Sequence, residues 1–469
     1  MALNIQILPL TFFSSFTFPD MTTDYTSGHS SQLPHIIVIG GGFAGLNAIT
    51  HLDLRLWRVT VIDANNFHSF PPLFYQVASA GLDAASICFP LRRELRKLRS
   101  PNVTFNMGKV DCIDTGRKTV HTDLETLHYD RLIIAAGTTN NYFGNDELAQ
   151  SVYTIKSTDE SVRCRNDILR RLEKAAIETS EQKRREMLHF VVVGGGPTGV
   201  EIAGALGEMK RYVIPREYPS IRQSDVSITI IEGSSRLLRT MSESSSKRAA
   251  DGLGALMVET KLNSILKTYD PDRRCVELVT GETLPASMVI WTAGVTGVRF
   301  AFQGVDIDAK TGQPTFVSNG NRLLTDRYCR IKGLEDVYAI GDISLVHGDE
   351  AWPKGHPQLA QVAIQQGRLV ARNLNEYARR GAAARIREFS YRDKGSMATI
   401  GRNRAVVDMG KIHLGGFPAW MAWMGVHLLS LLGMRNKITV LINWIWAYFN
   451  YASSLRLIIR PSKLPNDHM

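Results

Sequence analysis

The stretch His35-Ile-Ile-Val-Ile-Gly-Gly-Gly-Phe-Ala-Gly45 decides the fold, because an apolar strand runs there directly into a glycine turn. A helical pattern follows over 46–52, and a second apolar strand, 59–62, ends in an acid. This order is typical of a parallel βαβ unit that binds a dinucleotide, with the phosphates near the glycines and a ribose near the acid. The expected contacts are Gly40, Gly42, Gly45 and Asp63.

The same pattern occurs a second time in the middle of the chain. The strand Phe190–Val193 runs into Gly194-Gly-Gly-Pro-Thr-Gly199, and a later strand, Val226–Ile231, ends in an acid. Each copy also has a partner strand that ends in Ala-Gly, and the distance from first to last glycine is 97 residues in one copy and 100 in the other. Two units with matching spacing predict two dinucleotide sites. The expected contacts of the second are Gly194, Gly196, Gly199 and Glu232.

The two copies differ in the distance between the glycines and the acid. Asp63 follows the last glycine of its loop by 18 residues, close to the ~20 of a minimal unit. Glu232 follows by 33 residues, so we expect an elongated helix and loop over 205–224. A carboxylate at this place repels the 2′-phosphate of NADPH and favours NADH, while the nearby Arg236 and Arg239 leave the preference open.

A third segment, Asp336–Asp342, is predicted to be a short strand that ends in Gly-Asp. Behind two dinucleotide units, this placement puts Asp342 on the ribityl chain or phosphate region of a flavin. The first unit is then interrupted by the second and completed after it, which gives an α/β fold with two Rossmann-like domains. The expected boundaries are 1–34 for an N-terminal extension, 35–156 and 295–410 for the first domain, 157–294 for the second domain, and 411–469 for a membrane-association region.

Two apolar runs near the C-terminus, 419–434 and 438–452, contain four of the seven tryptophans. Each run is shorter than the ~20 residues that a helix needs to cross about 30 Å of hydrocarbon. The second run follows helical spacing, and basic residues outnumber acids over 415–469. This pattern is typical of amphipathic helices that lie in the membrane interface. A buried helix pair or a dimer interface is the alternative.

The N-terminus starts with an apolar, aromatic stretch over residues 1–20. It lacks the basic start and the small-residue cleavage site of a signal peptide. We therefore interpret 1–34 as a flexible, dispensable extension, with a weak membrane-facing segment as the alternative.

The composition fits a globular chain and excludes several function classes. Hydrophobic residues make up 44% and charged residues 21% of the 469 residues, enough for a core spread over about three domains. The net charge of +10 suits an anionic partner without choosing one, and the dispersed basic residues match no nucleic-acid module. The five cysteines form no CxxC pair and the histidines show no ligand spacing, so we expect no metal and no disulfide framework. Hydrolysis has no support, since no GxSxG motif is present.

Several motifs together resemble those of one flavoprotein family. The order of motifs in this chain resembles that of a flavoprotein reductase with two dinucleotide sites. The motifs are GGGFAG (40–45), LIIAAGT (132–138), GGGPTGVE (194–201), WTAG (291–294) and VYAIGD (337–342). The segment 70–78, FPPLFYQVA, is similar to FxPLLYQVA of type II NADH dehydrogenases, apart from Pro72 and Phe74 where leucines are usual. The segment 360–367, AQVAIQQG, is similar to that family's quinone-site segment. The resemblance covers about residues 35–460.

This resemblance implies a non-proton-pumping enzyme that transfers hydride from NADH to bound FAD and then two electrons to a membrane quinone. The second glycine loop would hold NADH. The residues that would hold FAD are Gly40, Gly42, Gly45, Asp63, Gly137 and Asp342.

The resemblance also implies catalytic residues. Glu201 would lie near the nicotinamide and the flavin, although an acid at a helix N-terminus is also favourable without any catalytic role. Gln361 and Gln365 share one helix face and would line a quinone tunnel, with an exposed or capped polar face as the alternative. Lys394 would hydrogen-bond near the flavin or the quinone, and is otherwise an ordinary loop lysine.

Partners and alternatives follow from the same reading. We expect monotopic attachment to a lipid bilayer surface, on the inner face of the bacterial plasma membrane or, in a eukaryote, on the mitochondrial inner membrane. A homodimer is compatible with this attachment, but no sequence feature decides it. A sulfide:quinone oxidoreductase or another flavin-dependent reductase is the competing enzyme, and it needs cysteines beside the flavin, whereas Cys88, Cys164 and Cys329 lie in no such motif. A non-enzymatic flavoprotein scaffold is the third reading.

Overall fold

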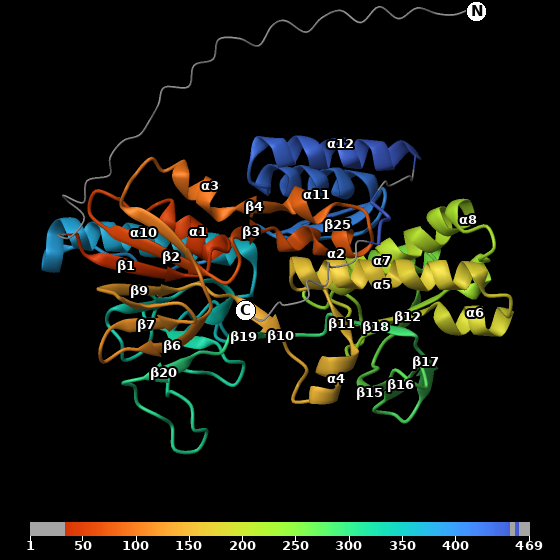
Figure 1. Cartoon of the computed structure of the whole chain (residues 1–469), viewed down its shortest axis with the longest axis horizontal. Coiled ribbons are helices and arrows are strands. Elements are labelled where there is room, and N and C mark those ends of the chain that lie inside the picture. Colours follow the sequence, from red (N-terminus) through yellow and green to blue (C-terminus); the bar gives the residue numbers. More distant parts are fainter. Residues whose placement is uncertain (1–32, 451–454, 459–469) are drawn as a thin grey trace, which may run out of the picture. The chain divides into compact units, whose positions relative to one another are not determined.

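The computed structural model describes residues 33–450 and 455–458. The N-terminal extension expected over 1–34 therefore lies outside the described residues, except for its last two positions. Two parallel sheets with their covering helices form the centre of the described part (Figure 1).

The first parallel sheet has the strand order β22-β9-β1-β2-β5. Its strands are β1 (His35–Ile39), β2 (Arg58–Asp63), β5 (Val103–Met107), β9 (Arg131–Ile134) and β22 (Val337–Ala339). The central strand β1 is buried along its whole length, as expected for an apolar run covered on both faces. The outer strand β22 comes from far along the chain and pairs with β9.

The second parallel sheet repeats this arrangement with the order β11-β18-β12-β13-β14. Its strands are β11 (Tyr153–Thr154), β12 (His189–Val193), β13 (Ser227–Ile231), β14 (Glu259–Lys261) and β18 (Met288–Trp291). All of the second sheet lies between β9 and β22 in the sequence, so the first domain is interrupted by the second. The predicted fold class, α/β with two Rossmann-like domains, is confirmed.

Four helices pack around these sheets. In the first domain α1 (Phe43–Ile49) lies against α10 (Ala360–Arg380), and a Cβ at Gly367 would lie 2.4 Å from the Ala44 carbonyl oxygen. In the second domain α7 (Pro197–Glu208) follows the glycine loop, and α9 (Glu243–Ala255) packs beside it. The close approach of α1 and α10 requires glycine at 367.

The segment 157–187, with its charged end, predicts a single crossover helix between the two domains, whereas the structure has two helices there. A capping box between Ser157 and Glu160 starts α5 (Thr158–Ile177), and the side chain of Ser180 caps a separate helix, α6 (Glu181–Met187). The helical pattern continues through the break, so periodicity alone did not reveal it.

The elongated helix and loop expected over 205–224 are confirmed. Helix α7 passes through a π-helical turn, η3 (Met209–Val213), into α8 (Ile214–Glu217). A loop then leads to the short helix η4 (Gln223–Asp225) and into β13.

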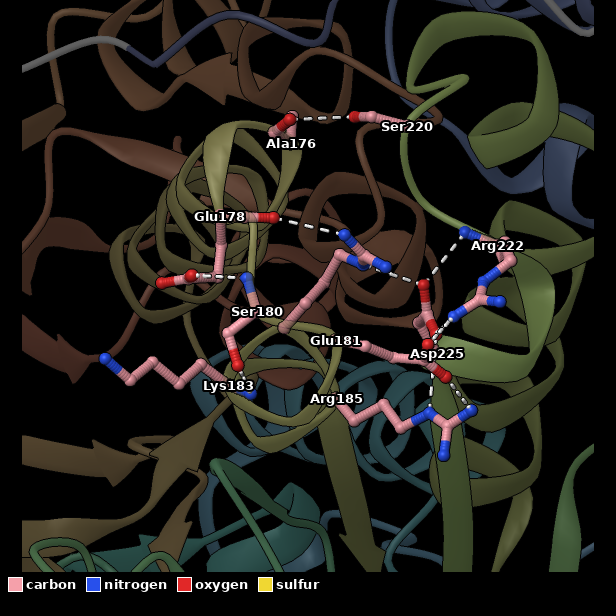
Figure 2. A network of polar contacts seen from close by, with 10 residues as sticks. Ala176, Glu178, Ser180, Glu181, Lys183, Arg185, Ser220, Arg222 and Asp225 are labelled. Carbon is pink, nitrogen blue, oxygen red and sulfur yellow. Dashed lines mark hydrogen bonds and ion pairs between the residues drawn. The ribbon is translucent and has the colours of Figure 1, made fainter.

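A buried carboxylate joins α6 to η4 (Figure 2). The side chain of Asp225 is fully buried and accepts hydrogen bonds from Arg184 Nε at 2.8 Å and from the Arg222 backbone N–H at 3.1 Å. Arg185 Nε also contacts it at 3.4 Å. Three arginines thus fix the turn that leads into the second sheet.

Smaller sheets complete the domains. The pair β10 (Thr138–Asn140) and β19 (Val295–Gly297) joins the two domains, because each strand directly follows the Ala-Gly of its own sheet. The other antiparallel or short strands are β3 (Phe67–Ser69), β4 (Cys88–Pro90), β6 (Val110–Asp114), β7 (Thr119–Thr122), β8 (Thr126–His128), β15 (Leu266–Asp270), β16 (Cys275–Leu278), β17 (Thr283–Pro285), β20 (Ala301–Gln303), β21 (Leu323–Thr325) and β23 (Ser344–Val346). The remaining short helices are η1 (Pro71–Leu73), α2 (Phe74–Ala78), η2 (Ala84–Ile87), α3 (Leu91–Arg96), α4 (Asp146–Ser151), η5 (Gly341–Ile343) and η6 (Gly381–Ala383).

The C-terminal region combines a small sheet with two helices. The sheet contains β24 (Ser396–Gly401), β25 (Arg404–Met409) and β26 (Ile412–Gly415), and the helices are α11 (Gly416–Ser430) and α12 (Met434–Asn450). Figure 1 shows α11 and α12 side by side. Among the described residues, no helix is both long and apolar enough to span a membrane.

Candidate active site

The first glycine loop leaves an open space at its middle. Gly40 turns the chain from β1 into α1 with a φ of +102°, and a Cβ there would lie 2.5 Å from the Ala135 carbonyl oxygen. Gly45 has less room still, since its Cβ would lie 1.9 Å from the Gly40 carbonyl oxygen. A Cβ at Gly42, in contrast, would meet no described atom within 4 Å, and no side chain caps the helix there. Packing does not explain this glycine, whereas a phosphate at the free N–H groups of the helix start does.

The second loop repeats these three roles. Gly194 has a φ of +109°, and its Cβ would lie 2.9 Å from the Ala293 Cα. A Cβ at Gly199 would lie 1.8 Å from the Gly194 carbonyl oxygen, and one at Gly196 would meet no described atom within 4 Å. Both loops therefore fit the pyrophosphate of a dinucleotide.

Each loop is also held by the acid that ends its second strand. Asp63 Oδ2 accepts a hydrogen bond from the Gly41 backbone N–H at 2.7 Å, and Glu232 Oε2 accepts one from the Gly195 N–H at 2.5 Å. The sequence motif predicts only a contact with a ribose for these two acids. The structure adds a second role, because each carboxylate fixes the glycine next to the open space.

The flavin end of the first domain has two further predicted residues. Gly137 follows β9 with a φ of +71°, and its Cβ would meet no described atom within 4 Å, so the space beside it is open. Asp342 lies in η5, directly after β22. Burial raises the pKa of Asp342, and the charges of Lys156 and Arg322 oppose this rise. Neither basic residue stood out in the sequence, because each is a single cation in an unremarkable strand or loop.

Gln361 and Gln365 hold the loop before β24 against α10. Gln361 Nε2 donates to the Gly395 carbonyl at 3.0 Å, and its Oε1 accepts from the Lys394 backbone N–H at 2.9 Å. Gln365 makes the same pair of contacts with the backbone of Arg392, each at 3.0 Å. The structure thus brings Gln361, Gln365 and Lys394 together, with both amides bound to backbone and the Lys394 side chain exposed.

A third glutamine of the same helix was missed by the sequence analysis. Gln366 is 1% exposed, and its Oε1 accepts a hydrogen bond from the Gly341 backbone N–H at 2.6 Å. This bond ties α10 to the turn that carries Asp342. No local sequence signal distinguishes Gln366, because its role depends on Gly341, which lies 25 residues earlier in the chain.

Glu201 is the fifth residue of α7, just beyond the first turn of the helix, and follows the last glycine of its loop by two residues. Its side chain is buried under β24, where the Thr399 backbone N–H donates to Oε1 at 3.4 Å. Burial raises the pKa of Glu201 to about 8, against the opposing hydrogen bond from the Thr399 backbone N–H. Glu201 is therefore mostly a neutral carboxylic acid at pH 7.

Aromatic and amide side chains surround Glu201 on the C-terminal side. Gln76 Nε2 donates to Tyr75 Oη at 2.8 Å, and Trp444 Nε1 donates to Gln76 Oε1 at 2.8 Å. The rings of Trp423 and His427 stack with centroids 4.1 Å apart, and burial lowers the pKa of His427 to about 4. No sequence pattern predicts these contacts, because hydrogen bonds between residues so distant in the chain leave no local signal.

A cleft of about 140 Å³ continues along the same face of α7. Glu201, Ala205 and Glu208 are spaced by four and three residues, so they share one face of the helix. Ala205 and Glu208 line the cleft together with Asn443 and Trp446 of α12. The cleft therefore lies between the second dinucleotide domain and the amphipathic helices.

The cysteines do not form a redox site in the described part of the chain, where all five are free thiols. Burial raises the pKa of the Cys164 and Cys329 thiols, which keeps them protonated and weakly reactive at neutral pH. Residues 33–450 and 455–458 also contain no group of three His, Cys, Asp or Glu side chains that could hold a metal ion.

Known proteins share this architecture. Residues 34–367 match the family described as pyridine nucleotide-disulphide oxidoreductase, and residues 394–450 match the NDH2 C-terminal domain. The type II NADH:quinone oxidoreductase Ndh of Mycobacterium tuberculosis is 33% identical over 87% of this chain and 87% of its own length. The NDH2 structure from Plasmodium falciparum in complex with NADH superposes with a TM-score of 0.80 at 22% identity, over 91% of this chain and all of that chain. The sulfide:quinone oxidoreductase of Aquifex aeolicus shares the fold with a TM-score of 0.66 at 19% identity, over 89% and 96% of the two chains.

Two glycine-loop domains, the first interrupted by the second, define the class of the chain as a flavoprotein reductase of the pyridine nucleotide-disulphide oxidoreductase type. Within this class the chain belongs to the type II NADH:quinone oxidoreductase family. The resemblance seen in the sequence motifs is confirmed, and the sulfide:quinone oxidoreductase is a distant neighbour that shares the fold.

Proposed function

We propose that the chain oxidises NADH and reduces a membrane quinone through bound FAD, without pumping protons. The observation that carries this function is the pair of matched glycine loops in a chain of the type II NADH:quinone oxidoreductase family. Each loop has open space beside one glycine, Gly42 in the first and Gly196 in the second. When bound, FAD supplies the redox chemistry, taking hydride from NADH and giving two electrons to the quinone. The protein positions the two nucleotides and keeps water away.

The two loops divide the cofactors between them. The first loop holds FAD together with Gly137 and Asp342. The open spaces beside Gly42 and Gly137 lie in the same domain as the carboxylates of Asp63 and Asp342. The second loop holds NADH at Gly194, Gly196 and Gly199. Glu232 contributes its remaining acceptor capacity to the adenosine ribose while it fixes Gly195.

Glu201 acts as a proton carrier beside the nicotinamide and quinone. Its buried carboxylic acid holds a proton at neutral pH, and a reduced quinone needs two protons for its two electrons. The cleft along the same face of α7 gives this proton a route toward solvent through Glu208. Burial also raises the pKa of Glu208, against the Arg402 backbone N–H and the charges of Arg402 and Arg404.

Gln361 and Gln365 form one wall of the quinone site by holding the loop that carries Lys394. Both amides are bound to backbone, so they position the loop and do not offer free donors. The Lys394 ammonium makes no hydrogen bond or ion pair among the described residues, which leaves it available to a quinone carbonyl oxygen. These roles follow the family resemblance and the contacts of the loop.

The chain attaches to the surface of a bilayer through α11 and α12. Large apolar side chains on these helices are exposed, among them Leu429, Ile442, Trp446 and Phe449 at 58–75%. A soluble surface rarely exposes such a contiguous patch, which is typical of a membrane or protein contact. We place the enzyme on the inner face of the bacterial plasma membrane or, in a eukaryote, on the mitochondrial inner membrane. Homodimerisation through the same helices is the alternative use of this surface.

Absorption spectroscopy of the purified protein tests the function. The yellow flavin absorbance should bleach on anaerobic addition of NADH and return on addition of a short-chain quinone. Bleaching without return on quinone would contradict quinone reduction, and a colourless protein that cannot be reconstituted with FAD would contradict the whole assignment. Alanine at each cysteine should leave the cycle intact, since no thiol takes part in it.

A further inference from the structure

The region around α3 exposes an unusual density of positive charge. Over 92–99 there are five basic residues and one acid. Lys97 Nζ pairs with Glu94 at 2.6 Å, and the Arg92 guanidinium lies 5.0 Å from the centre of the Phe105 ring. The side chains of the other three basic residues are exposed and make no hydrogen bond, ion pair or ring contact among the described residues: Arg93, Arg96 and Arg99.

The packing of α3 turns this charge outward. Leu91 and Leu95 are buried at 0% and 4% exposure on the inner face of the helix. A Cβ at Gly41 would lie 2.7 Å from the methyl carbons of Leu91, so α3 rests directly on the first glycine loop. With its apolar face fixed in this way, the helix presents its arginines to the surroundings.

The arginines lie beside the amphipathic helices. Asn436 Nδ2, near the start of α12, donates to the carbonyls of Ala85 at 3.3 Å and Cys88 at 3.2 Å, just before α3 begins. A Cβ at Gly433, in the turn before α12, would lie 3.5 Å from the Phe89 ring. Figure 1 shows α3 and α12 along the same edge of the molecule.

The two elements have complementary surface chemistry. Helix α12 exposes Ile438, Ile442 and Ile445 at 50%, 58% and 49%, and the exposed Arg435 lies at its start. Apolar side chains flanked by unpaired cations are the combination that binds an anionic bilayer surface, since the apolar part enters the interface and the cations meet the head groups.

We propose that α3 and the turn after it form a second membrane contact, in which Arg93 and Arg96 of the helix and Arg99 of the turn bind the head groups of anionic phospholipids. The proposal rests on the proposed attachment of α11 and α12 to a bilayer. Two contacts on one edge would fix the rotation of the enzyme on the membrane, which a single helix pair leaves free. The apolar helices then provide binding to any bilayer, and α3 provides the preference for anionic lipid.

Vesicle sedimentation of the full-length holoenzyme tests the proposal. The variant Arg93→Gln/Arg96→Gln/Arg99→Gln is compared with Arg117→Gln/Lys310→Gln/Lys332→Gln, which removes the same charge at three exposed positions outside α3 and α12. Each head-group contact contributes about fivefold to binding, so the α3 variant should bind vesicles of mixed anionic and zwitterionic lipid about 100-fold more weakly. Binding to purely zwitterionic vesicles and NADH oxidation with a water-soluble quinone should not change.

The outcomes separate the two proposals. A loss on anionic vesicles that is specific to the α3 variant, and that shrinks at high salt through screening, supports the α3 contact. Equal binding of the α3 and control variants to anionic vesicles would overturn it, even if both bind well through α11 and α12. Wild-type enzyme that binds neither kind of vesicle would overturn the attachment itself, and the α3 contact with it.

Discussion

The two glycine loops have the same geometry but different electrostatic surroundings. Burial dominates at Asp63 and raises its pKa, in spite of hydrogen bonds from the N–H groups of Asn65 and Gly41. At Glu232 burial also raises the pKa, but hydrogen bonds from Ser234 and Gly195 outweigh it, and the net pKa is lowered. Burial thus outweighs hydrogen bonding at the Asp63 carboxylate, and hydrogen bonding outweighs burial at the Glu232 carboxylate. This difference suits a cofactor that stays bound in the first and one that exchanges in the second.

The difference extends to the helix that follows each loop. Two residues after the last glycine, the first domain has Asn47 and the second has Glu201. Asn47 donates to the Phe43 carbonyl and accepts from Arg368 Nε at 3.1 Å, so it serves packing against α10. Glu201 lies instead beneath β24 with a pKa of about 8. The two copies share one scaffold, and this position carries an amide in the first copy and a buried carboxylic acid in the second.

The largest effect should come from a methyl group at the last glycine of each loop. Gly45→Ala places a Cβ 1.9 Å from a backbone oxygen, and Gly199→Ala places one at 1.8 Å, so each loop must shift. Overpacking of this kind costs about 1–3 kcal/mol, which lowers nucleotide affinity by about fivefold to 150-fold. Gly45→Ala should lose FAD on gel filtration, whereas Gly199→Ala should keep its yellow colour and lose NADH binding, measured by anaerobic titration.

Gly254→Ala is the matched control for both changes. This glycine lies in α9, and a Cβ there would meet no described atom within 4 Å. The control should keep both nucleotides and gain slightly in stability, because alanine favours a helix. Loss of FAD in Gly199→Ala, with Gly45→Ala unaffected, would reverse the assignment of the two loops.

The next effect is a loss of stability that should arise in the second domain alone. Asp225→Asn leaves three arginines around a neutral side chain that is fully buried (Figure 2), which costs about 3 kcal/mol of unfolding free energy. Glu181→Gln removes an acid of the same network that is 46% exposed, and should cost less than about 1 kcal/mol. Chemical denaturation followed by tryptophan fluorescence measures both. Equal costs for the two variants would show that burial of Asp225 contributes nothing.

The sequence predicted the fold because its decisive signals are local. Each strand, glycine turn and terminal acid lies within one short segment, and the repeat of the pattern made the pair of domains visible. The split of 157–187 into α5 and α6 was missed, since the cap at Ser180 lies within a continuous helical pattern. The residues that bind each nucleotide were predicted from the same motifs and stay a prediction.

The surroundings of the site could not be predicted in the same way. Gln366, Lys156 and Gln76 acquire their roles from partners that lie far away in the chain, such as Gly341 and Trp444. Such contacts depend on tertiary packing and leave no spacing to read. The acids Asp63 and Glu232 show the same limit, because their contact with a ribose follows from the motif while their bond to the loop does not.

A change at Glu201 should make stability less dependent on pH. Because its pKa rises from 4.5 to about 8 on folding, the folded chain keeps a proton that the unfolded chain releases between these values, and stability falls as pH rises through this window. Glu201→Gln replaces the titrating acid with an amide that does not titrate. Its unfolding free energy should therefore rise relative to that of the wild type by about 2–3 kcal/mol as the pH goes from 6 to 8. Asn47→Asp, at the equivalent position of the first domain, is the reciprocal change. A pH-independent difference between wild type and Glu201→Gln would contradict the raised pKa.

The smallest effect should concern the choice between NADH and NADPH. Glu232→Ser removes both the negative charge and the acceptor that holds the Gly195 N–H, whereas Glu232→Gln keeps an acceptor and removes only the charge. If repulsion of the 2′-phosphate sets the preference, both variants should lower the ratio of kcat/KM for NADH over NADPH, by about tenfold or 1.4 kcal/mol. Only the serine variant should also raise KM for NADH through a loosened loop. The positive charge of the neighbouring Arg239 lowers the pKa of Glu232. In both variants the Arg239 guanidinium no longer faces a carboxylate at position 232, so it can attract the 2′-phosphate of NADPH. An unchanged ratio in both variants would show that Glu232 only fixes the glycine loop through the Gly195 N–H and does not select between NADH and NADPH.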